Sequence, residues 1–398
     1  MPDDQLPTLR VSPERFIAGG EVLGHDDEGR VVFVRGGAPG DDVSVQIVER
    51  KGEWSRGIVT EVHTPSSDRV EPPCVRRREG CGGCDWQHLA VPAQLPAKLE
   101  IVRDALRRTG RLADPVLTLG RSVPADGYRT TIRLVGGPDG RASYRQERSH
   151  DTVPASGCLI AHPALLPVIE SLRITPELEV SLRVSESTGQ MTARWDKRKG
   201  EVHGLPRSVY AGANAFLVER VAGHDLRVSA GSFFQSGPAA AELLVDAVGR
   251  AAPELSSAGT VLDAYAGVGL FAVACAPRSA KVVTVETSRS AVDDCTVNLD
   301  GRDARVERSE VSTWRPGRDL SIDVAIADPA RSGLGRPGTA AMAAADPDVL
   351  VLVSCDPVAL ARDADLLGRH GYRHDGTEAL DLFPHTHHVE CVTRFVRG

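Results

Sequence analysis

Residues 236–398 alternate between strand-like and helix-like segments, and this rhythm constrains the fold more than any other feature. Apolar runs occupy residues 260–266, 281–287, 323–330 and 349–355, with Ala-rich or amphipathic segments between them. Strands separated in this way by helices form a parallel sheet with helices on both faces. We therefore predict a doubly wound, Rossmann-like α/β domain for this part of the chain.

Two further segments precede that domain. Residues 1–70 contain short β-rich runs broken by Gly, Pro and Asp turns, which is the pattern of a small β-barrel. Residues 71–235 begin with a cysteine cluster, continue through an Arg-rich helix and then show hairpin signals, which indicates a central α+β domain. We expect three domains with these boundaries.

Neither a signal peptide nor a membrane span is recognisable. The N-terminal segment lacks an apolar core, and no stretch reaches the roughly 18 consecutive apolar residues that cross a bilayer. We therefore expect a cytoplasmic protein without a membrane partner. No feature implies a protein partner, so a monomer is expected.

A glycine-containing loop follows the first strand of the predicted sheet. It carries Asp263, Tyr265, Gly267 and Gly269 and runs directly into a helix, at the edge where doubly wound sheets bind ligands. The next strand ends at Glu286, whose carboxylate can accept hydrogen bonds from both hydroxyls of a ribose. A nucleoside cofactor is therefore expected at this loop.

A dinucleotide is the obvious competitor for this loop. Its fingerprint requires three glycines, G-x-G-x-x-G, and the third position here is Ala272. The carboxylate of Asp263 would repel a pyrophosphate but suits the ammonium group of a methionine. These features favour S-adenosylmethionine over NAD.

Cys355 ends the strand 349–355 and stands before a helix, where the helix dipole would favour its thiolate form. A buried structural cysteine is the commonest alternative. The preceding strand, however, ends in Asp328 at the same expected edge, and residues 382–390 bring three histidines and Glu390 before the last strand. A cofactor loop, a thiol and carboxylates should therefore meet there, with the histidines in structural roles.

Cys74, Cys81 and Cys84 form a C-x6-C-x2-C pattern, and Cys158 follows in a later turn. In a reducing compartment, clustered cysteines indicate metal binding or catalysis more often than disulfides. Four thiolates suit either tetrahedral zinc or a four-iron cluster, and the spacing alone leaves both open. Four unrelated reduced cysteines are the remaining alternative.

Several stretches resemble the RNA 5-methyluridine methyltransferases that carry an N-terminal TRAM domain. The similarity covers nearly the whole chain and is most specific in SFFQSG, VLDAYAGVG, ADPARSGLG, LVSCDPVALARD and LFPHTHHVE. It implies a TRAM barrel for residues 1–70, a class I methyltransferase fold for residues 236–398, S-adenosylmethionine as cofactor, and ribosomal or transfer RNA as partner. It also favours a [4Fe-4S] cluster on the four cysteines.

The same resemblance implies roles for individual residues. Cys355 would be the nucleophile that adds to C6 of uracil, and Glu390 would accept the C5 proton. The residues that would line the cofactor and uracil site are Gln235, Tyr265, Glu286 and Asp328.

This chain departs from many relatives by having Asp356 after the cysteine, Ser236 and Gly237 after the glutamine, and Leu270 in the cofactor loop. Two other functions remain open at this point. One is methylation of another base or of a small molecule, with Cys355 as a structural thiol. The other is RNA binding without catalysis.

RNA binding has to be reconciled with a net charge of −7. Polyanion-binding proteins usually carry an excess of Lys and Arg, so local patches would have to make the contacts. A solvated surface is the alternative for each patch. The candidate patches are Arg76, Arg77 and Arg78; Arg103, Arg107, Arg108 and Arg111; and Arg141, Arg145 and Arg148.

Overall fold

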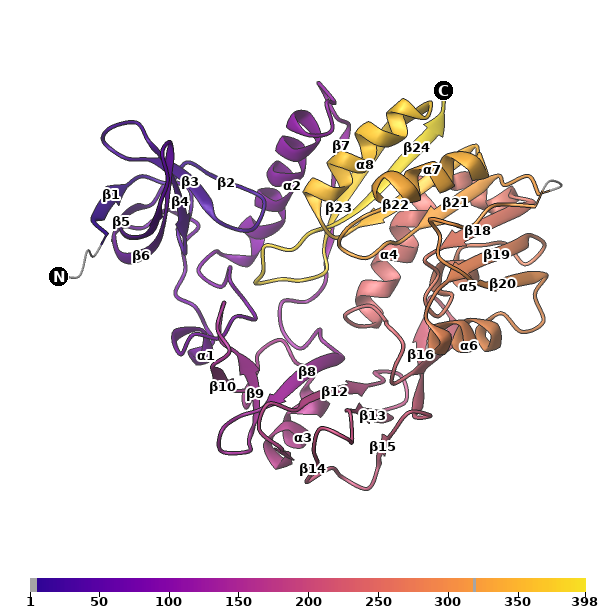
Figure 1. The fold of residues 1–398 in the computed structure, drawn as a ribbon, viewed down its shortest axis with the longest axis horizontal. Coiled ribbons are helices and arrows are strands. Elements are labelled where there is room, and N and C mark those ends of the chain that lie inside the picture. The colour runs from indigo at the N-terminus through magenta and orange to yellow at the C-terminus, as the bar shows by residue number, and fades with distance from the viewer. Residues whose placement is uncertain (1–5, 318–319) are drawn as a thin grey trace.

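The N-terminal strands form a six-stranded sheet in the order β1-β5-β6-β4-β3-β2 (Figure 1). The computed structural model describes residues 6–317 and 320–398. Alternate residues of β5 are buried, and their side chains build a small apolar core with those of β1 and β4. The strands are β1 (Thr8–Val11), β2 (Arg15–Phe16), β3 (Val22–His25), β4 (Val31–Arg35), β5 (Asp42–Arg50) and β6 (Trp54–Thr64).

The central part of the chain contains the cysteine loop, two helices and a second sheet. Helix α1 (Val75–Arg78) lies inside the cysteine loop, and α2 (Val91–Arg108) follows it. The sheet has the order β10-β9-β8-β12-β13-β15, and α3 covers it together with the 3₁₀ turn η1. Its elements are β8 (Thr131–Gly136), β9 (Ala142–Arg145), β10 (Thr152–Pro154), η1 (Pro163–Leu165), α3 (Leu166–Ser171), β12 (Glu179–Val184), β13 (Met191–Arg194) and β15 (Val209–Ala211).

Two small antiparallel pairs complete the central part. One joins β11 (Arg173–Ile174) to β14 (Val202–His203). The other is the hairpin of β16 (Phe216–Val221) and β17 (His224–Ser229), which packs against α4 and α6 of the C-terminal part. This hairpin therefore connects the central sheet to the last domain.

The C-terminal sheet has eight strands in the order β20-β19-β18-β21-β22-β24-β23-β7. Every residue of β21 and β22 is buried, as expected for parallel strands covered by helices on both faces. The strands are β18 (Thr260–Ala264), β19 (Lys281–Glu286), β20 (Ala304–Arg308), β21 (Val324–Ala327), β22 (Val349–Ser354), β23 (Tyr372–Asp381) and β24 (Glu390–Arg397). The predicted Rossmann-like fold is confirmed.

The helices of this domain lie on the two faces of the sheet. They are α4 (Pro238–Ala251), the 3₁₀ turn η2 (Pro253–Ser257), α5 (Leu270–Ala274), α6 (Arg289–Asn298), α7 (Gly335–Ala345) and α8 (Pro357–Arg369). In the part of the chain that the structure describes, no helix has the length and apolar character to span a bilayer.

One strand of the C-terminal sheet comes from much earlier in the chain. β7 (Leu117–Ser122) pairs in parallel with β23, and α2 packs beside α8 (Figure 1). Both elements lie inside the segment 71–235 that the sequence assigns to the central domain. Residues 91–122 thus contribute to the C-terminal core. Without β7, one side of β23 would be a sheet edge with unpaired backbone groups, and β7 forms hydrogen bonds with that edge.

The three parts of the chain meet around Trp86 and Lys98. The ring of Trp86 stacks on Phe16, with 4.3 Å between ring centroids, and its Nε1 donates to the carbonyl of Gly20 at 3.0 Å. Beneath it, the fully buried Lys98 pairs with Asp381 at 2.6 Å. One contact set therefore fixes the N-terminal sheet, α2 and the end of β23 together.

We predict that Lys98→Met destabilises the protein by about 3–5 kcal/mol, because removing one member of a buried ion pair leaves the other charge uncompensated. Urea unfolding followed by near-ultraviolet circular dichroism measures the loss. The double variant Lys98→Met/Asp381→Asn should recover much of it, and Lys281→Met, at an exposed lysine, should change little. A loss below about 1 kcal/mol in the single variant would contradict the role given to this pair.

Candidate functional site

A pocket of about 630 Å³ opens at the carboxyl edge of the C-terminal sheet. The strands β18, β19, β21 and β22 all end there, so residues distant in sequence converge on it. The structure brings all six residues that the sequence singled out for catalysis and cofactor binding to this one pocket: Gln235, Tyr265, Glu286, Asp328, Cys355 and Glu390.

The loop after β18 forms one side of the pocket. Tyr265, Gly267 and Gly269 all have positive φ angles (62°, 55° and 86°), which turns the chain tightly from β18 into α5. A Cβ atom at Gly269 would lie 2.9 Å from the Sγ of Cys295, so the helix can pack this closely only without a side chain there. The loop backbone is consequently open toward the pocket.

Glu286 is held rigidly at the end of β19. Its carboxylate accepts hydrogen bonds from the backbone N–H groups of Gly267 (3.0 Å), Thr287 (2.7 Å) and Ser288 (2.7 Å). These bonds connect the strand end to the glycine loop and orient the carboxylate at the pocket wall. It is placed to accept further hydrogen bonds from hydroxyl groups of a ligand.

Asp263 does not occupy the position expected for it. Its side chain is fully buried beneath the loop, where Oδ2 accepts a hydrogen bond from Ala272 N at 2.8 Å, and it does not line the pocket. Burial raises the pKa of Asp263 to about 7. In this structure the carboxylate braces the start of α5, and the contact with a methionine ammonium stays a prediction.

Cys355 follows β22 directly and lies in the pocket as a protonated thiol. Burial, and next the nearby Glu390, raise the pKa of Cys355 to about 11, against a smaller lowering by Arg331. Asp356 caps α8 and accepts from Val358 N (3.0 Å) and Ala359 N (2.8 Å), so these two N–H groups are already paired within the protein. The helix N-terminus is thus satisfied by Asp356.

Asp328, which is partly buried, and Glu390, which is buried, are carboxyl groups of the same pocket. Burial raises the pKa of both, and Asp328 raises that of Glu390 further. Gln235 Nε2 donates to Asp328 Oδ2 at 3.1 Å, which favours ionisation of Asp328 over Glu390. Two neighbouring carboxyl groups resist simultaneous ionisation, so the pair can hold one proton near neutral pH.

Two of the histidines before β24 differ in their surroundings: His387 contacts the cysteine loop, and His388 lines the pocket. His387 Nδ1 lies 2.6 Å from Asp85 Oδ2 and so joins this loop to the cysteine loop. His388 lines the pocket beside Arg331, and burial, followed by the charge of His387, lowers its pKa to about 3, which keeps the ring neutral. The structural role expected for the histidines thus fits His387.

Sequence reasoning missed Arg331 as a pocket residue. Its guanidinium is the cation that lowers the pKa values of both Cys355 and Glu390. The residue stands three positions after Asp328 in the segment ADPARSGLG, and that proximity was the available signal. Aromatic walls were missed as well: Phe233, Phe234 and Phe383 line the same pocket.

The four cysteines Cys74, Cys81, Cys84 and Cys158 line a separate pocket of about 420 Å³. Burial, followed by the proximity of Cys158, raises the pKa of Cys84 to about 12, and burial also raises that of Cys81. The buried Tyr144 Oη in this pocket has no hydrogen-bond partner among the described residues. Within residues 6–317 and 320–398, no three His, Cys, Asp or Glu side chains are grouped to hold a single metal ion.

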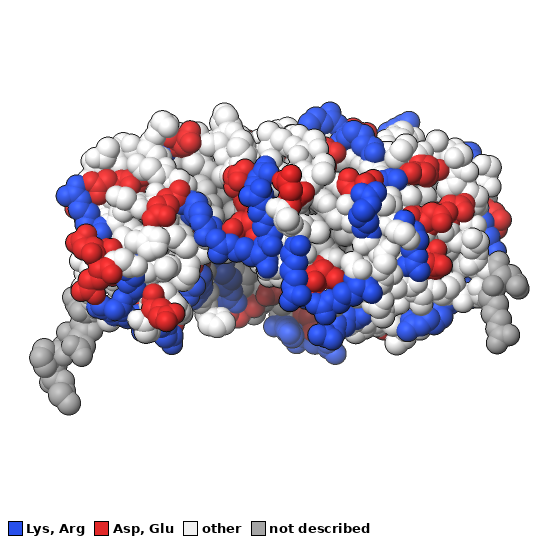
Figure 2. All heavy atoms as spheres, turned by 90° about the horizontal axis from the view of Figure 1, so that it is seen from above, with Lys and Arg blue, Asp and Glu red and all other residues white. Residues whose placement is uncertain are grey.

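The arginine clusters found in the sequence are neutralised by neighbouring carboxylates. All ten of these arginines form ion pairs, and on the face seen in Figure 2 basic and acidic side chains are interspersed. These ion pairs are compatible with a solvated surface, and RNA contact by the patches stays a prediction. The pairs are Arg76–Glu79, Arg77–Glu147, Arg78–Glu71, Arg103–Glu100, Arg107–Asp114, Arg108–Asp104, Arg111–Asp365, Arg141–Asp139, Arg145–Glu177 and Arg148–Glu21.

Comparison with known proteins gives consistent matches along the chain. Residues 8–60 match the TRAM domain family. An RNA methyltransferase of Streptomyces coelicolor is 33% identical over 94% of this chain and 89% of its own length. One of Corynebacterium glutamicum is 32% identical over 98% of this chain and 97% of its own length.

Two further matches have more specific names. The 23S rRNA (uracil(1939)-C(5))-methyltransferase of Shewanella piezotolerans is 29% identical over 93% of this chain and 92% of its own length. The crystal structure of Pyrococcus abyssi tRNA (uracil-54, C5)-methyltransferase with S-adenosyl-L-homocysteine superposes with a TM-score of 0.74 and 25% identity. It covers 98% of this chain and 99% of that one.

We predict that alkylation of Cys355 by iodoacetamide is slow at pH 7 and rises roughly tenfold per pH unit toward pH 9, because the thiolate is the reactive form and the thiol pKa lies above that range. Arg331→Gln should slow alkylation further, since it removes the charge that lowers this pKa. Peptide mass spectrometry resolves Cys355 from the other cysteines. Arg336→Gln, at an exposed arginine outside the pocket, is the control. A rate independent of pH would refute the raised pKa.

Proposed function

This chain is an S-adenosylmethionine-dependent enzyme of the RNA methyltransferase family, and from that premise we propose that it methylates C5 of a uridine in ribosomal or transfer RNA. The observation that carries the proposal is the meeting of Cys355 and Glu390 in one buried pocket beside the glycine loop. Methylation at C5 of a pyrimidine needs both a nucleophile that adds to C6 and a base that removes the C5 proton, whereas methylation at an RNA nitrogen or oxygen does not need this combination. Similar proteins that act on uracil C5 support it.

In the proposed reaction, Cys355 activates the base. Its Sγ bonds to C6 of uracil after losing the thiol proton, and the electrons of the C5–C6 double bond move to O4 as an enolate. S-adenosylmethionine, when bound, supplies the methyl group that C5 then takes. Arg331, the cation near Cys355, favours the thiolate that the addition requires.

Glu390 completes the reaction by taking the proton from C5. The electrons of that C–H bond restore the double bond and expel the thiolate of Cys355 from C6. A carboxylate whose pKa is raised by burial is a stronger base than an exposed one, so the environment of Glu390 suits this step. The neighbouring Asp328 raises the pKa of Glu390 further, and Arg331 lowers it, which favours the ionised form that accepts the proton.

The remaining pocket residues hold the two reactants. We propose that Glu286 accepts hydrogen bonds from the ribose hydroxyls of the cofactor and that Tyr265, in the glycine loop, lies against it. Gln235 and Asp328 line the same pocket as Cys355, and their amide and carboxylate can form hydrogen bonds to the edge of a uracil ring. Phe233, Phe234 and Phe383 supply apolar walls beside these groups.

We also propose that Cys74, Cys81, Cys84 and Cys158 hold a [4Fe-4S] cluster. The four thiols come from separate segments yet line one pocket, and a cluster of four irons spans more space than a single ion. Cys81 and Cys84 are protonated when free, so bound iron would convert them to thiolates and compensate their burial. The unpartnered hydroxyl of Tyr144 could donate to a sulfur atom there. The proposed role is structural.

We expect Glu390→Gln to accumulate a covalent protein–RNA adduct, because methyl transfer can proceed while the C5 proton stays in place. Total cellular RNA and methyl-labelled S-adenosylmethionine are incubated with the variant, and denaturing electrophoresis detects labelled adduct. Turnover should fall at least about 100-fold. The double variant Cys355→Ala/Glu390→Gln should give no adduct, and Glu242→Gln, on the exposed side of α4, should behave as wild type.

Mass spectrometry of the wild-type product should show 5-methyluridine. Normal turnover by Glu390→Gln, or an inactive variant without adduct, would remove Glu390 as the base. A product other than 5-methyluridine would overturn the proposed function itself.

For the cysteine pocket, anaerobically purified protein should be brown and contain about four irons per chain. Cys81→Ser should lose colour and iron, whereas Cys275→Ser, outside the pocket, should keep both. Colourless protein with a single zinc would contradict the cluster.

A further inference from the structure

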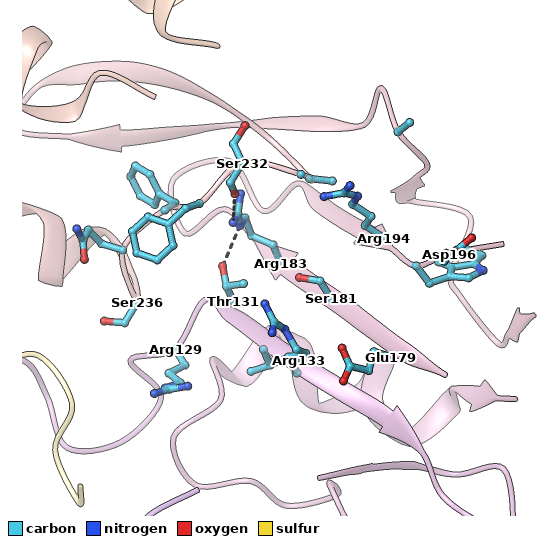
Figure 3. Close-up of a pocket in the computed structure, with 18 of the residues that line it drawn as sticks. Arg129, Thr131, Arg133, Glu179, Ser181, Arg183, Arg194, Asp196, Ser232 and Ser236 are labelled. Atoms are coloured by element: carbon cyan, nitrogen blue, oxygen red, sulfur yellow. Dashed lines mark hydrogen bonds between the residues drawn. The ribbon is translucent and has the colours of Figure 1, made fainter. Parts of the chain in front are cut away.

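A large groove of about 1060 Å³ lies next to the catalytic pocket. One wall is the face of β8 and β12, a second is the end of β13 with the loop 195–198, and the third is the loop 230–236 (Figure 3). Phe233, Phe234, Gln235, Phe383 and Arg129 line both the groove and the catalytic pocket. The two spaces are therefore continuous, and a chain lying in the groove would reach Cys355.

The groove has more basic than acidic side chains in its lining. Six basic and two acidic side chains line it, although the whole protein carries a net charge of −7. Arg133, Arg194 and Lys197 form no ion pair with any described residue, and the acidic Asp196 is occupied by Arg198 at 2.9 Å. This contrasts with the ten paired arginines described above, so these cations remain available for an anionic ligand.

The walls of the groove are rigidly built. Arg183 is buried in its floor and donates to the carbonyl oxygens of Ser229 (3.1 Å) and Ser232 (2.8 Å) and to Thr131 Oγ1 (2.8 Å), which ties β12 to the opposite loop (Figure 3). Arg194 passes so close to Gly231 that a Cβ there would lie 2.7 Å from its Nη1. In Figure 3, Arg133 and Arg194 extend toward the middle of the groove from different walls.

Aromatic side chains accompany these cations. Trp195 lines the groove, with Lys197 Nζ 5.8 Å from its ring, and Phe233 is 71% exposed at the entrance to the catalytic pocket. Free cations interleaved with accessible aromatic rings are the combination by which proteins hold single-stranded nucleic acid, with phosphates on the cations and bases stacked on the rings. A duplex keeps its bases stacked internally and would leave Trp195 without a partner.

We propose that this groove holds an unpaired RNA segment flanking the target uridine, with phosphates on Arg133, Arg194 and Lys197 and one base stacked on Trp195. This proposal rests on the proposed function for the identity of the nucleotide in the pocket. The substrate class it specifies is RNA that is single-stranded for several nucleotides on one side of the methylated position.

The test measures RNA binding directly, without methyl transfer. Fluorescence anisotropy gives the affinity of wild-type protein for a labelled 12-nucleotide oligouridylate and for the same strand paired with oligoadenylate, at several salt concentrations. The single strand should bind at least about tenfold more tightly. Arg194→Ala/Lys197→Ala should weaken single-strand binding about tenfold or more and make the log–log salt slope shallower by about 1.4, roughly 0.7 for each lost phosphate contact.

Two further variants separate stacking from charge. Trp195→Ala should weaken binding of the single strand by about 5- to 100-fold, whereas Trp195→Phe should stay near wild type because it keeps a ring. Arg207→Ala removes an exposed cation of the same domain outside the groove and should bind as wild type. All variants should retain the wild-type melting temperature and affinity for S-adenosylmethionine, which excludes misfolding.

Equal affinity for duplex and single strand, or wild-type binding by both Arg194→Ala/Lys197→Ala and Trp195→Ala, would overturn the groove as an RNA site. Neither result would affect the adduct experiment on Glu390, which tests the chemistry at uracil. Conversely, if Glu390→Gln gives no adduct, the binding measurements still decide whether the groove takes single-stranded RNA.

Discussion

The buried ion pair between Lys98 and Asp381 holds the geometry of the catalytic pocket. Lys98 Nζ also donates to the carbonyl of Phe383 at 3.3 Å, and the adjacent Trp86 N donates to the carbonyl of His385 at 2.9 Å. These bonds fix the loop between β23 and β24, which ends at Glu390. The position of the proposed base thus depends on α2 and the cysteine loop, nearly 300 residues earlier in the chain. Charges buried this deeply are tolerated only where both partners are fixed, so the pair imposes one arrangement on three parts of the protein.

The charged side chains that lack an ion-pair partner among the described residues distinguish the catalytic pocket and the groove from the rest of the surface. Arginines over most of the surface are matched by nearby carboxylates, which explains how an acidic protein can carry so many of them. In the catalytic pocket the carboxyl groups of Asp328 and Glu390 lie near the thiol of Cys355, and burial raises the pKa values of all three. In the adjoining groove basic side chains outnumber acidic ones. A polyanion would therefore be attracted to the groove and not to the pocket, where the neutral uracil ring is expected.

The sequence was sufficient to predict the sheet and its reactive edge. Strand periodicity located β18, β19, β21 and β22, and because parallel strands end at one edge, Glu286, Asp328 and Cys355 could be expected to meet. Some local details were not predicted: Asp263 points beneath the loop, and Asp356 occupies the helix end that was expected to activate Cys355. Contacts between residues that are distant in sequence could not be predicted either. Neither the carboxylates facing each arginine cluster nor the return of β7 to the last sheet follows from local pattern, because both depend on tertiary packing.

The placement of β7 affects how the chain is made. Among the described residues, this strand pairs in the sheet with β23 alone, which lies about 250 residues later in the sequence. At a synthesis rate of roughly 5–20 residues per second, β7 and α2 wait some 10–50 s before that partner emerges from the ribosome. During this interval the apolar face of α2 has no cover from α8. The N-terminal sheet can fold as it is synthesised, but the methyltransferase domain cannot close until β23 and β24 have emerged from the ribosome.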